Sequence, residues 1–291
     1  MPLTDRQMLT LLHLSDLHFG PPFVPEVGEA VLVAAAQLRP DIVVASGDFT
    51  QRAKRNQYSQ ARAFLDRLPR VPTVVVPGNH DVPLYRLFER IFQPYAHYQK
   101  YISAELESVL VRDDAVIVAL NTTSPLRHIV NGRIARRQLD FCTAAFRDAP
   151  ATAARIVVAH HHFAPAPDYE DEDDVMWRAR EALDRFAELR VELILGGHLH
   201  RAYIGNSLDV YPGQSRDSGI IIAQCGTSTS RRGRGREREK NTFNLVAIGP
   251  DVTQITHYMY FHEIGGFAPF SRHTFPRRDR RYLPDSGAAD A

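Results

Sequence analysis

The chain lacks the long apolar run that a membrane-spanning helix needs. Such a helix requires ~20 consecutive apolar residues, and no stretch of this 291-residue sequence reaches that length. An excess of one charge is missing too, because 35 Lys and Arg residues nearly balance 34 Asp and Glu residues. No overall electrostatic field therefore draws the protein to nucleic acid or to an anionic membrane. We expect a soluble protein for which nucleic acid is not a partner.

Cysteine is scarce. The only two cysteines, Cys142 and Cys225, lie in or beside apolar stretches and are too far apart for a CxxC motif. A disulfide framework and a Cys-rich structural zinc site are thereby excluded. Two buried free thiols suit a reducing compartment, which predicts a cytoplasmic protein.

Strand-like runs alternate with amphipathic helical patterns along the first two hundred residues. This alternation predicts βαβ units, a largely parallel sheet and an α/β fold. Beyond about residue 200, strand-like runs follow one another without helices, which favours a second, more antiparallel sheet packed on the first. The expected helices cover 24–38, 56–68, 135–147 and 175–189, and the expected late strands cover 219–224, 242–248 and 252–260.

Three segments interrupt or follow this pattern. Residues 84–107 form a helical insert rich in Tyr and Phe, which either packs as a cap on the core or acts as a lid over a ligand. Residues 230–238 contain five arginines. They form a solvated loop, or residues 227–236 curl over the site and arginines such as Arg231 and Arg232 hold a substrate phosphate. A third alternative is that the same arginines contact nucleic acid or anionic lipid. We expect one domain over residues 1–265, followed by a basic, flexible tail over 266–291.

Five short polar motifs each follow an apolar, strand-like run. In an open α/β sheet the carboxyl ends of the strands line one crevice, and ligands bind there. Segments far apart in the sequence are therefore expected to offer their side chains to a common centre. The motifs are Asp16-Leu17-His18, Gly47-Asp48, Gly78-Asn79-His80-Asp81, His160-His161-His162 and Gly197-His198-Leu199-His200.

The donors in these motifs are oxygen and nitrogen atoms without a thiolate. That set suits Mn, Fe, Co, Ni or Zn in a catalytic role, and we expect Mn, Fe or Zn. Seven ligands exceed what one metal needs if it also binds substrate. Two metal ions ~3.5–4 Å apart that share a carboxylate account for all seven, and such a pair lowers the pKa of a bound water from ~15.7 toward ~7. The seven candidate ligands are Asp16, His18, Asp48, Asn79, His160, His198 and His200.

The five motifs, in this order, resemble those of the calcineurin-like metallophosphoesterase family, and the resemblance covers about residues 9–260. It implies an α/β sandwich of two sheets flanked by helices, with two metal ions at the strand ends. It also implies a ligand set: Asp16, His18 and His200 for one metal, Asn79, His160 and His198 for the other, and Asp48 as the bridge. Of the catalytic residues, His80 would donate a hydrogen bond to a phosphoryl oxygen or protonate the leaving group, and Asp81 would orient His80.

One motif departs from the family pattern, because many relatives have His-His-Pro where this chain has His162 as the third residue. We assign His160 as the metal ligand because it comes first after the strand, and His161 as a residue that contacts substrate or supports the ligands.

The pattern is most similar to that of bacterial proteins like the class III cyclic nucleotide phosphodiesterases. It implies that a hydroxide bridging the metals attacks a small phosphodiester, with cyclic AMP as the leading example. The alternatives are a lipid-precursor pyrophosphatase like the UDP-diacylglucosamine hydrolases, a nuclease, and a non-catalytic scaffold like the related retromer subunit. The sequence makes no prediction of the oligomeric state.

Overall fold

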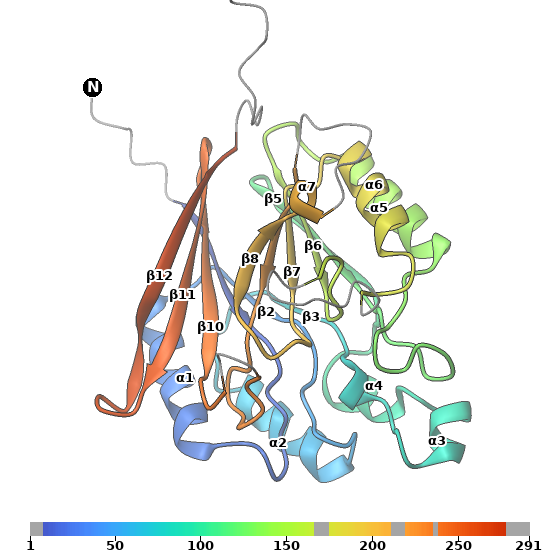
Figure 1. The fold of residues 1–291 in the computed structure, drawn as a ribbon, viewed down its shortest axis with the longest axis vertical. Helices are drawn as coiled ribbons and strands as arrows, with labels where there is room; N and C mark the ends of the chain where they lie inside the picture. The colour runs from blue at the N-terminus through green and yellow to red at the C-terminus, as the bar shows by residue number, and fades with distance from the viewer. Residues whose placement is uncertain (1–7, 166–174, 211–218, 235–237, 278–291) are drawn as a thin grey trace, which may run out of the picture.

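Two six-stranded sheets pack face to face, with helices on their outer surfaces (Figure 1). This computed structural model describes residues 8–165, 175–210, 219–234 and 238–277. The strand order is β12-β11-β10-β1-β2-β3 in the first sheet and β4-β5-β6-β7-β9-β8 in the second. The α/β sandwich flanked by helices that the sequence predicts is confirmed.

The first sheet is parallel at one side and antiparallel at the other. β1, β2 and β3 run parallel, and β10, β11 and β12 add to β1 as an antiparallel meander. Its strands are β1 (Leu9–Leu14), β2 (Ile42–Ala45), β3 (Thr73–Val75), β10 (Thr242–Ile248), β11 (Val252–Phe261) and β12 (Gly266–Pro276).

The second sheet has a parallel centre and antiparallel edges. β5, β6, β7 and β9 run parallel, whereas β4 and β8 pair antiparallel at the two edges. Its strands are β4 (Ser108–Val111), β5 (Ala115–Leu120), β6 (Ala154–Ala159), β7 (Leu193–Gly196), β8 (Tyr203–Asn206) and β9 (Ile221–Gln224).

Each central strand is apolar on both faces because both faces are covered. In β1, Leu9 and Leu11 point into the layer between the sheets, while Leu12 and Leu14 face the helices outside the first sheet. Strands that are buried on both faces read as continuous apolar runs, which is why these strands are visible in the sequence. The outer helices are α1 (Pro25–Leu38), α2 (Arg55–Leu65), α5 (Arg136–Arg147) and α6 (Ala179–Glu188).

The strands after residue 200 do not form a sheet of their own, so that expectation is wrong. β9 joins the second sheet beside β7, and β10 to β12 extend the first sheet. Residues 266–276, expected in the flexible tail, form β12, which pairs with β11 along its length and packs Phe267 on Phe243. Residues 278–291 of the expected tail lie outside the described residues.

The aromatic insert divides into two short helices, α3 (Leu87–Phe92) and α4 (Ala96–Tyr101). Tyr98 of α4 is fully buried in the core beside α2. No residue of α3 is buried. The interpretation of the insert as a cap that packs on the core therefore holds for α4 alone. Among the described residues, no helix is long and apolar enough to cross a membrane.

Candidate metal centre

The turns that follow β1, β2, β3, β6 and β7 meet at one end of the sandwich. Backbone hydrogen bonds link them directly, from Asp16 N to Gly47 O at 3.0 Å and from Gly197 N to His160 O at 3.0 Å. The five motifs therefore surround one centre, as the carboxyl ends of parallel strands predict.

A first group of four buried side chains consists of Asp16, His18, Asp48 and His200, whose ligand atoms all lie within 4.8 Å of one another. The Nε2 atom of His200 lies 3.0 Å from Asp16 Oδ1, and that of His18 lies 3.6 Å from Asp48 Oδ2. Asp16 Oδ1 and Asp48 Oδ2 have no hydrogen-bond donor of suitable geometry among the described residues. Buried carboxylate oxygens require a partner, and a metal cation fits these two.

A second group adjoins the first through Asp48. His160 Nε2 lies 3.5 Å from Asp48 Oδ2 and 3.2 Å from Asn79 Oδ1. His198 Nδ1 lies 3.0 Å from the same amide oxygen of Asn79. The other oxygen of Asp48 accepts a hydrogen bond from His80 N at 2.8 Å. Asp48 Oδ2 thus faces both groups, as a shared carboxylate must.

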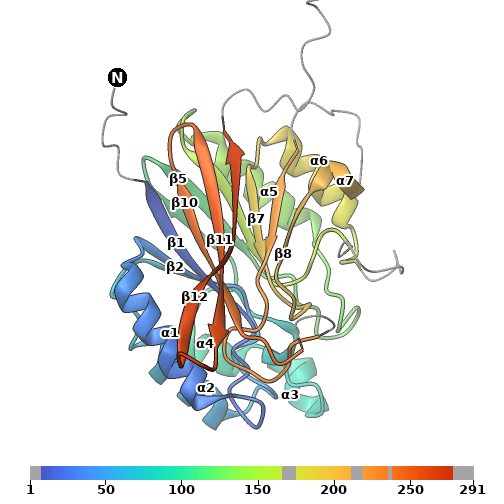
Figure 2. The same cartoon turned by 60° about the vertical axis from the view of Figure 1, so that its left-hand side comes forward.

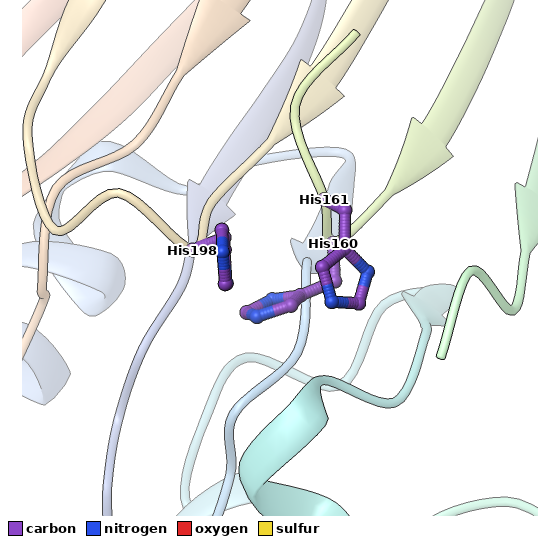
Figure 3. A group of neighbouring side chains, drawn as sticks. All are labelled: His160, His161 and His198. Carbon is purple, nitrogen blue, oxygen red and sulfur yellow. The ribbon is translucent and has the colours of Figure 1, made fainter. Parts of the chain in front are cut away.

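His161 belongs to the second group, whereas the sequence left open whether it contacts substrate or supports the ligands. Its imidazole lies beside those of His160 and His198, with the ring centroids of His161 and His198 4.8 Å apart (Figure 3). Its Nδ1 pairs with the Thr122 hydroxyl at 2.8 Å, and its Nε2 is buried without a hydrogen-bond partner among the described residues. The complete burial of His161 favours the interpretation that it supports the ligands and leaves Nε2 as one more candidate ligand atom.

Backbone carbonyls fix the orientation of two of the histidines. His160 Nδ1 donates to Ser46 O at 2.7 Å, and His200 Nδ1 donates to Arg232 O at 2.8 Å. A proton on Nδ1 leaves the lone pair of Nε2 free to bind a metal, which is the usual support for a histidine ligand.

The charges of the two groups also suit cation binding. Burial alone would raise the pKa of Asp16, but His200 holds that pKa well below its usual range. Burial opposes ionisation of Asp48 too, and the charge of His160 keeps its pKa low. Burial and neighbouring imidazoles hold the pKa of His198 far below its usual value. These two carboxylates are therefore ionised and His198 is neutral at pH 7, the forms that coordinate metals.

His80 lies beside Arg232 at the edge of the centre. Its Nδ1 donates to Gln51 O at 3.0 Å, so Nε2 accepts from the Arg232 guanidinium at 3.2 Å. Burial lowers the pKa of His80, the charge of Asp48 raises it, and that of Arg232 lowers it further. Of the two arginines expected at the substrate, Arg232 lines this site whereas Arg231 is exposed.

Asp81 holds the backbone and does not orient the imidazole of His80, so that part of the prediction is wrong. One oxygen of its carboxylate accepts from the amide of Thr50 at 2.9 Å. The other accepts from the amides of Phe49 at 3.1 Å and Gly78 at 3.0 Å. Asp81 thereby fastens the turn after β3 to the turn after β2.

A cavity of about 240 Å³ opens beside the centre. Its lining includes side chains of the two ligand groups and His80. It also includes three arginines, Arg52, Arg232 and Arg234, and four apolar residues, Val82, Leu84, Ile129 and Val130.

A model of the calcineurin-like phosphoesterase family matches residues 9–202. The chain belongs to this family. It is 26% identical to a cAMP/cGMP dual specificity phosphodiesterase of Mycobacterium tuberculosis (strain CDC 1551 / Oshkosh), with 95% of this chain and 86% of that protein aligned. It is 24% identical to a probable cyclic nucleotide phosphodiesterase of a Synechococcus species, over 72% of this chain and 80% of that one.

Solved structures with the same fold include PhoD, with a TM-score of 0.72 at 12% identity, over 96% of this chain and 72% of that one. The purple acid phosphatase PPD1 of yellow lupin has a TM-score of 0.70 at 13% identity; the alignment covers 96% of this chain but only 56% of the lupin enzyme. A dimetal phosphatase of Danio rerio has a TM-score of 0.62 at 13% identity, over 92% of this chain and 98% of that one. These likenesses show the fold. With the family match and the Asp/His clusters, the protein is a metal-dependent phosphoric ester hydrolase of a dimetal family.

Several residues at the metal centre of this calcineurin-like phosphoesterase have strained backbone conformations, which the sequence did not indicate. Five of the non-glycine residues with positive φ are candidate ligands: Asp16, His18, Asp48, His198 and His200, with φ between 50° and 75°. Such conformations cost about 1–3 kcal/mol each and persist where the surroundings enforce them. A glycine allows the close approach of two of these turns, because a Cβ at Gly78 would collide with Asp48.

Sequence reasoning missed several residues of the cavity. Arg52 was not expected there, and neither were the apolar residues Val82, Ile129 and Val130. Arg52 follows the Gly47-Asp48 motif by only a few residues, which is the one signal that pointed to it. Ile129 and Val130 are next to no motif, so the sequence did not point to them. They lie in the long loop after β5, which brings them to the cavity.

Proposed function

We propose that this phosphoesterase hydrolyses a small phosphodiester, with a cyclic nucleotide as the leading substrate. The observation that carries the proposal is the position of Asp48, whose Oδ2 lies 3.6 Å from His18 Nε2 and 3.5 Å from His160 Nε2. A single carboxylate oxygen between two nitrogen-rich groups suits two metal ions that share a bridge. The similarity to cyclic nucleotide phosphodiesterases supports the choice of a diester.

The ligand groups divide between two metals, with Asp48 common to both. When bound, a metal pair supplies an activated water at neutral pH and neutralises charge on a phosphoryl group. Oxygen and imidazole donors suit Mn, Fe or Zn. Asp16, His18 and His200 would hold one ion, and Asn79, His160 and His198 the other, with His161 close to the second.

His80 is proposed as the proton donor to the leaving oxygen. Its Nε2 faces the cavity, and its Nδ1–H bond to the carbonyl of Gln51 keeps the ring in this orientation. In the free site Nε2 accepts from Arg232. When Arg232 turns to a phosphoryl oxygen, His80 Nε2 is released, can take up a proton from solvent water and can pass that proton to the departing alkoxide.

Arg232 is proposed to bind the phosphoryl group. Its guanidinium is partly buried and already held by Gln51 Oε1 at 2.9 Å, so little conformational freedom is lost when it binds an anion. Arg231 is exposed and is not proposed as a contact.

The mixed lining of the cavity, with arginines and apolar side chains, supports a diester over a monoester. A diester carries two organic substituents and one charge, whereas a monoester carries two charges at neutral pH. The apolar residues Val82, Leu84, Ile129 and Val130 offer a surface for the second substituent, such as a nucleoside.

The test is hydrolysis of bis-p-nitrophenyl phosphate, p-nitrophenyl phosphate and cyclic AMP by the Mn²⁺-supplemented protein. We expect the aryl diester to be preferred over the monoester and cyclic AMP to be hydrolysed. Asp48→Ala should reduce all activity to background, because both metals lose a ligand. Asp66→Ala is the matched control, since its carboxylate is 64% exposed and pairs with Arg62 on α2. Preference for the monoester would overturn the proposal.

A further inference from the structure

α3 exposes a row of large apolar side chains. Leu87, Phe88, Ile91 and Phe92 are 57%, 73%, 44% and 66% exposed, and the rings of Phe88 and Phe92 lie against each other with centroids 4.7 Å apart. Single exposed apolar residues are common, whereas contiguous ones mark surfaces that meet another molecule or a membrane. α3 is also the helix that contributes no buried residue to the core.

This apolar surface continues to the mouth of the catalytic cavity. Ile91 of α3 and Leu126 of the loop after β5 line the same surface hollow, of about 330 Å³. In that loop Leu126 is 64% and Val130 is 62% exposed. Val130 and Leu84 in turn line the cavity beside His80. We call the exposed residues Leu87, Phe88, Ile91, Phe92, Leu126 and Val130 the α3 face.

The α3 face is surrounded by positive charge. Residues 84–95 and 122–134 together contain four arginines and one acidic residue, Glu89. Three of the arginines, Arg90, Arg127 and Arg133, line the hollow that Ile91 and Leu126 share. A symmetric dimer through this face would set these arginines against their own copies, since a twofold interface pairs a patch with itself. An anionic partner with an apolar interior would instead complement both the charge and the apolar side chains.

We propose that the α3 face docks on an anionic lipid surface and thereby presents the mouth of the catalytic cavity to that surface. Phe and Leu side chains enter the boundary between headgroups and acyl chains, while the arginines stay at the level of the lipid phosphates. A short amphipathic element with few basic residues gives reversible, charge-dependent binding. The inference does not depend on which phosphoester is the substrate.

Vesicle co-sedimentation of the full chain tests the proposal, with phosphatidylcholine vesicles that contain or lack phosphatidylglycerol. We expect binding only to the anionic vesicles, and weaker binding at high salt because the attraction is screened. Phe88→Ser/Phe92→Ser should weaken binding by about tenfold or more, since two apolar side chains no longer enter the lipid.

The matched control is Ile264→Ser/Phe270→Ser. These residues are 65% and 62% exposed, and they lie in the hairpin loop between β11 and β12 and in β12, far from α3 (Figures 1 and 2). The control should bind like the unmodified protein. Both variants should keep full hydrolysis of bis-p-nitrophenyl phosphate in solution, since none of the four residues lines the catalytic cavity.

Three results would overturn the docking proposal. They are no binding to anionic vesicles, equal binding to neutral vesicles, and unchanged binding of the Phe88→Ser/Phe92→Ser variant. A dimer in analytical ultracentrifugation that this variant dissociates, without vesicle binding, would assign the face to self-association instead. Hydrolysis of bis-p-nitrophenyl phosphate in solution is measured separately from vesicle binding. A failure of docking is therefore distinguishable from a failure of the proposed phosphodiesterase activity.

Discussion

Arg232 contacts the centre through both its backbone and its side chain. Its carbonyl accepts the Nδ1 proton of His200, and its guanidinium donates to His80 and to Gln51. One residue therefore ties the position of a candidate metal ligand to that of the proposed proton donor. Its neighbour Arg231 has neither contact, although the two are equivalent in the sequence.

Replacing Arg232 by Ala should lower kcat/KM for the diester by about 10–100-fold, which corresponds to the ~1.5–3 kcal/mol of a hydrogen bond to a charged group. Metal content should stay the same, because the carbonyl that holds His200 remains. Steady-state kinetics and metal analysis of the two variants Arg232→Ala and Arg231→Ala provide the comparison. Equal kinetics in the two would show that Arg232 does not act on the substrate.

The residue types of the site were predictable, but their orientations were not. Motif residues Asp16, Asp48 and His198 follow strands whose apolar runs are evident in the sequence. Whether a buried histidine such as His161 faces the metals or the substrate depends on a hydrogen bond to Thr122, which is distant in the sequence. No local pattern encodes that contact.

The turns at the strand ends carry the site, and Asp81 fastens two of them together. Its carboxylate accepts backbone amides from the turn after β2 and from the turn that it belongs to. Between them these turns carry the candidate ligands Asp48 and Asn79 and His80, the proposed proton donor. Asp81 is therefore a positioning residue.

Asp81→Ala should lower the free energy of unfolding by about 3 kcal/mol or more, since three buried amides lose their acceptor at roughly 1–3 kcal/mol each. Activity and metal affinity should fall together with stability. Urea denaturation, metal titration and diester kinetics measure the three effects.

Asp41→Ala is the control for Asp81→Ala. Asp41 accepts from the backbone and hydroxyl of Thr10 at the opposite end of β1, so its loss should reduce stability and leave activity intact. If Asp81→Ala abolished turnover without loss of stability or of metal affinity, the side chain would act in the chemistry itself.

Elements with a clear apolar run or helical pattern were predicted well. The late strand β10 lies at 242–248 as expected, and α1 and α5 lie within a residue of the expected 24–38 and 135–147. β5 is wholly buried and apolar, but it precedes no metal-ligand motif and follows a short edge strand, so it was not assigned. The insert at 84–107 was recognised, but its composition reveals neither that α4 packs against α2 nor that α3 stays exposed.

In the whole molecule, each sheet combines strands that are far apart in the sequence. β1 pairs with β2, its near neighbour in sequence, and with β10, more than two hundred residues later. Periodicity identifies a strand but not its partner, which is why the late strands were assigned to the wrong sheet. Arg277 illustrates the same limit: expected in a basic, flexible tail, it directly follows β12 and donates to Glu192, which lies next to β7 of the second sheet, at 2.9 Å.

The central claim is that the two buried groups around Asp48 act as one dimetal phosphodiesterase site. The most direct test is titration of the chelator-treated protein with Mn²⁺, with bound metal and bis-p-nitrophenyl phosphate hydrolysis measured in the same samples. The account predicts that activity rises until about two ions are bound per chain and that Asp48→Ala neither binds the pair nor turns over. Full activity in the metal-free protein, or none on the diester with two ions bound, would contradict it.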